Sequence, residues 1–65
     1  MSIKTAIKFD NGMVMVFDGR GRQVPEYQGK YDNVKDLVLM DSTSRTKFLN
    51  GTWGSPLTQV KKEDW

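Results

Sequence analysis

Hydrophobic and polar residues alternate strictly along the first segment of the chain, IKTAIKF at residues 3–9. Alternation with a period of two is typical of a β-strand with one buried face. The segment runs into Asn11-Gly12, a pair favoured in two-residue type I′ turns because both central residues there need a positive φ. MVMVFD at residues 13–18 then predicts a second strand. We expect an antiparallel hairpin of residues 3–9 and 13–18.

A two-residue loop at Asn11-Gly12 determines which side chains share a face of this hairpin, because directly opposed residues point to the same side. The face predicted to be core carries Ile3, Thr5, Ile7, Phe9, Val14 and Val16. The opposite face carries Lys4, Ala6, Lys8, Met13, Met15 and Phe17. A one-residue slip or a bulge would reassign these side chains between the two faces.

The middle of the chain predicts a short third strand and one helix. RQV favours a strand that ends at Pro25, which has no amide hydrogen to donate to a sheet. The next segment has apolar residues at helical spacing, namely Tyr31, Val34, Leu37 and Val38. We expect a helix over residues 33–41 and a polar loop over 42–45, although LVLM alone is also consistent with a buried strand.

The last third of the chain contains a second Asn-Gly pair. It predicts a strand that ends at residue 49, a tight turn at Asn50-Gly51 and a short return through residues 52–53. A serine followed by Pro56 is a helix-start pattern, so we expect either one or two helical turns there or a frayed tail.

Together these elements predict a single α+β domain over residues 1–65. Its small antiparallel sheet of three to five short strands starts with the N-terminal β-hairpin, and one short helix accompanies it. The alternative is an all-β SH3-like barrel in which LVLM is a strand.

Composition argues against an enzyme. The 65 residues include no cysteine and no histidine, which removes disulfides, the usual zinc sites and the commonest general base. The eight carboxylates are scattered singly, and so small a chain has little volume to enclose a small-molecule substrate. We expect a non-catalytic protein with no cofactor and no metal site. Without a leader or a long apolar run, we expect it in the cytoplasm and not in a membrane.

Protein binding is the function that the apolar residues favour. If the helix does not cover the methionine-bearing face, that face stays exposed, and exposed apolar patches often mark interfaces. Methionine surfaces also adapt well to partners. The candidate protein-binding residues are Met13, Met15, Phe17, Trp53 and Trp65. We therefore expect a small interaction module, either a regulator or inhibitor of another protein or a self-associating homo-oligomer.

Binding of RNA or single-stranded DNA is the alternative function. Small sheets bind single strands through aromatic and basic side chains. The candidate nucleic-acid-binding residues are Lys4, Lys8, Arg20, Arg22 and Lys30. Ten basic side chains are nearly balanced by eight acidic ones, however, and the net charge of +2 is small for a nucleic-acid-binding domain.

Overall fold

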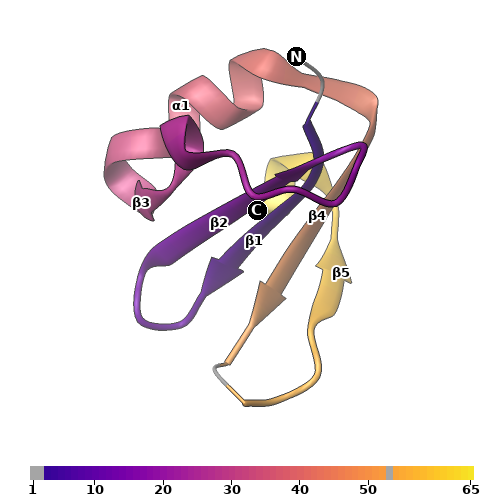
Figure 1. Ribbon diagram of the computed structural model, residues 1–65. Coiled ribbons are helices and arrows are strands. Elements are labelled where there is room, and N and C mark those ends of the chain that lie inside the picture. Colours follow the sequence, from indigo (N-terminus) through magenta and orange to yellow (C-terminus); the bar gives the residue numbers. More distant parts are fainter. Residues whose placement is uncertain (1–2, 53) are drawn as a thin grey trace.

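The computed structural model describes residues 3–52 and 54–65, which form one five-stranded sheet with a helix on one side (Figure 1). The strands are β1 (Ile3–Phe9), β2 (Met13–Asp18), β3 (Gly29–Lys30), β4 (Ser42–Gly51) and β5 (Thr58–Val60). The helices are the α-helix α1 (Tyr31–Asp41) and the short 3-10 helices η1 (Pro25–Tyr27) and η2 (Lys62–Asp64). The predicted α+β class, the N-terminal hairpin and the single α-helix are confirmed.

The sheet has the strand order β3-β2-β1-β4-β5. Three of its neighbouring pairs are antiparallel, as expected, but β1 and β4 are parallel. Parallel neighbours need a long crossover connection. Here the chain returns from β2 through η1, β3 and α1 before it enters β4, and this return places α1 against the sheet.

The turn of the first hairpin has three residues, and the predicted two-residue loop is wrong. Gly12 N–H donates to Phe9 O at 2.9 Å, and Gly12 has φ +86°. Asn11 does not have the positive φ that a type I′ turn requires, since no described residue other than glycine has one. Asn11 instead accepts a hydrogen bond from Met13 N–H through Oδ1 at 3.0 Å. A turn that ends in a left-handed glycine is the usual geometry of three-residue hairpin loops.

The extra loop residue shifts the register by one position. Lys8 lies opposite Val14, and Ile7 lies opposite Met15. The predicted division of side chains between the two faces is therefore wrong for β1, although Val14 and Val16 do point away from the methionines. The valines share their face with Ala6, and all three are fully buried. A further register shift between Ile3 and Thr5 turns Ile3 back toward the same core.

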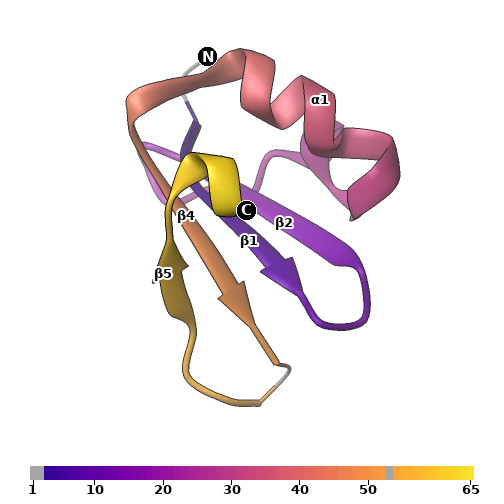
Figure 2. The same ribbon diagram turned by 180° about the vertical axis from the view of Figure 1, so that it is seen from behind.

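The core lies between the valine face of the sheet and α1. Val34 and Val38, one helical turn apart, pack there with Val14 and Val16, so α1 does not cover the methionine-bearing face. Trp65 belongs to this core and is 3% exposed. It follows η2, which Figure 2 shows on the same side of the sheet as α1. The other members of the cluster are Ile3, Ala6, Val24 and Phe48.

The expectations for the last third of the chain need correction. Asn50 and Gly51 do not form a tight turn, because both belong to β4 and lie opposite Lys8 and Phe9 of β1. The return strand is β5, in which Thr58 pairs with Asn50, so no helix begins at Pro56; the short 3-10 helix η2 comes only after β5. Long-range pairing with β1 thus overrides a local turn preference.

The segment predicted as a loop at residues 42–45 belongs to β4, although its pairing is irregular. Ser42 lies opposite Ile3 and Lys47 lies opposite Thr5, so β4 carries extra residues between these two positions. The third strand at RQV is reduced to one bridge between Gln23 and Phe17, and η1 begins at Pro25.

Candidate interaction surface

The side of the sheet opposite α1 forms a continuous apolar surface, which we call the open face. Cross-strand pairing places Ile7 between Met15 of β2 and Leu49 of β4, and it places Thr5 between Phe17 and Lys47. By strand alternation Phe9 and Met13 lie on the same side. The apolar members of the open face are therefore Ile7, Phe9, Met13, Met15, Phe17 and Leu49.

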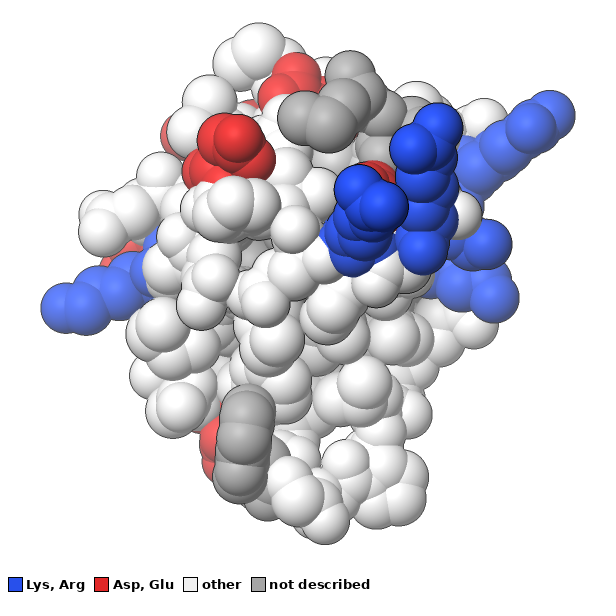
Figure 3. Space-filling view, in the orientation of Figure 1, with Lys and Arg blue, Asp and Glu red and all other residues white. Residues whose placement is uncertain are grey.

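Burial shows how these side chains shield one another. Ile7 is 8% exposed although it lies outside the core cluster on the α1 side, because its neighbours on both adjacent strands flank it. Met13 is 37% exposed, and Phe9, Met15, Phe17 and Leu49 are half-buried. Among the described helices and strands, none packs over this face. The centre of the space-filling view accordingly carries no Lys, Arg, Asp or Glu (Figure 3).

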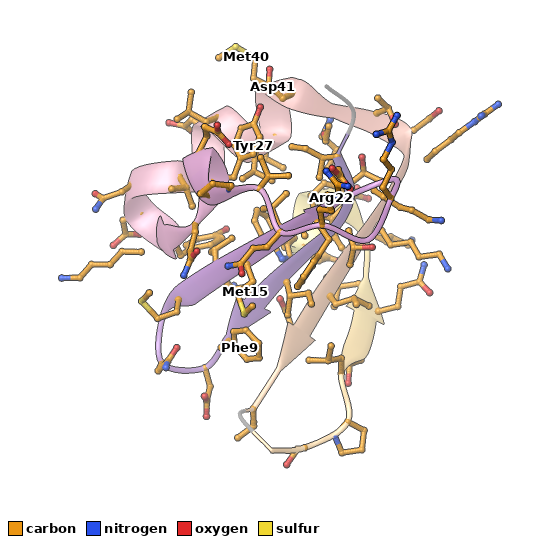
Figure 4. The ribbon with its side chains drawn as sticks, viewed as in Figure 1. Phe9, Met15, Arg22, Tyr27, Met40 and Asp41 are labelled. Carbon is orange, nitrogen blue, oxygen red and sulfur yellow. The ribbon has the colours of Figure 1, made fainter. Side chains whose placement is uncertain are left out.

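A shallow hollow marks the turn side of the open face. It has a volume of about 280 Å³, and Phe9, Met13, Met15 and Gln23 are among the residues that line it. Figure 4 shows Phe9 and Met15 close to each other, with Arg22 farther along toward the end of β2. The hollow is open to solvent, and its walls are mainly apolar.

Basic side chains gather at the end of the sheet where β1 begins and β2 ends. Lys47 lies opposite Thr5, which itself lies opposite Phe17. Lys4 and Arg45 line one hollow at this end together with Gly19, and Figure 3 shows Lys and Arg clustered there. We call this the basic end, and its members are Lys4, Arg20, Arg22, Arg45 and Lys47.

Asp18 shapes the turn that carries the two arginines. Its Oδ1 accepts hydrogen bonds from the backbone N–H of Arg20 at 2.8 Å and of Arg22 at 3.0 Å. These backbone hydrogen bonds, from Arg22 first and then Arg20, hold the pKa of Asp18 below its ordinary value, and the two guanidinium charges add to the effect. The carboxylate thus orders the loop from which both arginines project.

The structure brings some of the predicted nucleic-acid-binding residues together and separates others. Lys4, Arg20 and Arg22 belong to the basic end. Lys8 does not, because its Nζ lies 4.4 Å from the centre of the Tyr31 ring on the α1 side. Lys30 lies at the β3 margin, opposite Met13.

The structure also separates the predicted protein-binding residues. Met13, Met15 and Phe17 share the open face. Trp65 is part of the core, where its ring packs against Phe48 and Tyr31, so it presents no surface to a partner. Trp53 lies outside the described residues.

Sequence reasoning missed several members of this surface. The sequence pattern places Ile7 and Phe9 on the predicted core face and Leu49 at the end of a hairpin strand. It places Arg45 in a loop and Lys47 in the strand that follows. The signal that identifies Ile7 and Phe9 is the DNG sequence, since three-residue loops with glycine last are the next most common hairpin connection. Nothing local indicates Leu49, because its position depends on pairing with β1.

The described residues lack two other kinds of feature. In the described part of the chain, no three carboxylates gather in a way that could hold a metal ion. Within residues 3–52 and 54–65, no helix has the length and apolar content needed to cross a bilayer.

Comparison with known proteins adds no family to this description. The chain matches no protein-family model, no curated protein and no solved structure.

Proposed function

We propose that this chain is a non-catalytic interaction module that binds another protein through the open face. The observation that carries the proposal is the apolar surface built by three neighbouring strands with no described element packed over it. Folded domains normally cover such a surface, and uncovered apolar patches often mark protein interfaces. The methionines at this surface can adjust their shape to a partner because their side chains are unbranched and flexible.

The size of the open face indicates what kind of contact it makes. Three strands about 4.8 Å apart and about five residues long cover on the order of 250 Å². A standard protein interface buries about 800 Å² on each partner. The open face is therefore suited to a short segment of a partner, with neighbouring surface supplying the rest of the contact.

A single-stranded nucleic acid is the second candidate. The observation that favours it is the position of Phe17, separated from Lys47 only by Thr5 across the sheet. Aromatic rings beside basic side chains can stack bases and contact phosphates. Phe17 is half-buried, however, so only part of its ring is offered for stacking.

The experiment compares two methionine variants of equal chemistry. Met15→Gln places an amide in the middle of the open face, whereas Met40→Gln changes a methionine of α1 that is 74% exposed. Each tagged protein is used for affinity capture from the source cells, once without and once with nuclease treatment. Circular dichroism and thermal melting establish first that both variants fold.

We expect wild type and Met40→Gln to retain the same proteins, and Met15→Gln to lose them. Equal retention by all three proteins would refute the open face as the binding surface. Capture that disappears after nuclease treatment would instead support the second candidate.

A further inference from the structure

We propose that the open face binds a short apolar segment of a partner protein. This segment is flanked in sequence, at one end, by acidic residues that pair with the basic end. The inference rests on the proposed function and adds the chemistry and the orientation of the partner. Its basis is the distribution of charge along the strands, which is one-sided.

Charge is segregated on this small molecule although the net charge is only +2. Half of the ten Lys and Arg residues belong to the basic end. In the view of Figure 3, most of the visible acidic side chains lie on the side of η1 and α1, although basic side chains are present on that side too. Glu26 belongs to η1, and Asp32, Asp36 and Asp41 belong to α1. A partner that docks on the open face therefore meets most of the positive charge at one end, whereas Lys30, opposite Met13, lies at the β3 margin.

The basic end is also available for pairing with a partner. Lys4, Arg20, Arg22, Arg45 and Lys47 are all exposed. The carboxylate of Asp18 accepts hydrogen bonds from the backbone N–H groups of Arg20 and Arg22. Arg22 lies in the loop that follows β2, and Figure 4 shows it beyond Met15 toward the end of that strand. Carboxylates that arrive here would form charge-assisted hydrogen bonds with guanidinium groups, which suit bidentate pairing.

The same distribution argues against a nucleic acid. Phosphates repeat at every nucleotide, so a bound strand calls for cations along its whole path. Along β1, from Thr5 to Phe9, the residues on the open face are all uncharged, and Lys8 lies over the Tyr31 ring on the other side. Lys30 adds one cation at the β3 margin. Negative charge confined to one end of the ligand fits this surface better than charge spread evenly.

A second copy of this chain fits less well. The open face is on the order of 250 Å², far below the roughly 800 Å² that each subunit of a standard interface contributes. A face-to-face pair would also have to accommodate two basic ends without an acidic patch on the open face to match them.

The length of the open face along β1 determines how long the apolar segment of the ligand is and where its acidic residues lie. Thr5 and Phe9 are four residues apart on β1, which corresponds to about 13 Å along an extended strand. An extended segment of about four residues spans the apolar part, with its side chains on Ile7 and Met15. Its acidic residues then follow directly at the Thr5 end, near Lys47 and Arg22.

The test is a selection from a random peptide display library on the immobilised full chain, with Met15→Gln as the counter-selection bait. Enriched peptides are synthesised and their affinities are measured for wild type, for Lys47→Glu and for Lys62→Glu. The last variant is the matched control, because it makes the same change of charge at an exposed residue of η2. Circular dichroism confirms that each variant folds.

We expect the enriched peptides to have an apolar run with Asp or Glu concentrated on one side. Reversing the charge of Lys47 should weaken their binding roughly three- to tenfold, as expected for exposed ion pairs that become repulsive. Lys62→Glu should leave binding within roughly twofold of wild type, and added salt should reduce the difference between the two variants.

The other outcomes overturn the inference in distinguishable ways. Enriched peptides without an acidic excess, or equal losses for Lys47→Glu and Lys62→Glu, refute the acidic flank but leave the open face as a protein-binding surface. No enrichment over the Met15→Gln bait refutes the proposed function as well. If a poly(U) oligonucleotide binds more tightly than any peptide, the open face binds nucleic acid instead. If sedimentation shows a dimer that Met15→Gln abolishes, the open face binds a second copy of the chain.

Discussion

Replacing Trp65 by alanine tests the closure of the core directly. Trp65 is 3% exposed, and its ring centre lies 5.2 Å from that of Phe48 and 5.4 Å from that of Tyr31. Its indole N–H donates to Leu49 O at 3.1 Å, and the Tyr31 hydroxyl donates to Trp65 O. One side chain thus connects η2, α1 and β4 over the valine face of the sheet.

The expected loss is a large part of the total stability. Truncation of a buried tryptophan to alanine costs about 3–5 kcal/mol, including the cavity left behind. A domain of this length has a free energy of unfolding of about 3–10 kcal/mol. Trp65→Ala should therefore lower the midpoint of thermal unfolding by on the order of 20 °C, or leave the chain largely unfolded.

The assay is urea denaturation followed by far-ultraviolet circular dichroism, which does not depend on the tryptophan being changed. Trp65→Phe is the graded control, because it keeps an aromatic ring against Phe48 but removes the donor to Leu49 O. It should cost about 1–2 kcal/mol. An unchanged urea midpoint for Trp65→Ala would show that the tryptophan does not close the core, and the packing described above would then be wrong.

Three further predictions concern α1, the first turn and one phenol. Val38→Ala, at a fully buried position of α1, should lower the free energy of unfolding by about 2 kcal/mol in the same assay. Gly12→Ala should cost about 1 kcal/mol because Gly12 has φ +86°, whereas Gly19→Ala should be nearly neutral, since its added Cβ meets no atom within 4 Å and its φ is not positive. Tyr27 donates a hydrogen bond to the Asp41 carboxylate, which raises the pKa of Tyr27 above its ordinary value, so NMR titration should give a lower pKa in Asp41→Asn. This hydrogen bond should stabilise the fold below the ordinary pKa of tyrosine, and its contribution should disappear as the pH rises through the raised pKa of Tyr27. If the contribution is lost at lower pH, the Tyr27–Asp41 hydrogen bond is not its source.

Several elements were determined by the sequence alone, because their signals are local. Alternation in residues 3–9 and 13–18, with a turn sequence between them, specifies the first hairpin whatever the rest of the chain does. Helical spacing of Val34 and Val38 specifies α1, which begins two residues earlier than predicted and ends where predicted, at Asp41. The separation of Val14 and Val16 from the methionines follows from strand alternation alone.

Other features were decided only by the tertiary structure. A three-residue turn and a two-residue turn are both compatible with DNG, and the choice moves Ile7 from the core to the open face. Asn50-Gly51 is a turn signal by local preference, but pairing with β1 keeps it in a strand. Trp65 is sequence-distant from Tyr31 and Phe48, so only the folded chain brings them together. Register and burial depend on contacts between segments far apart in the chain, and no local pattern carries that information.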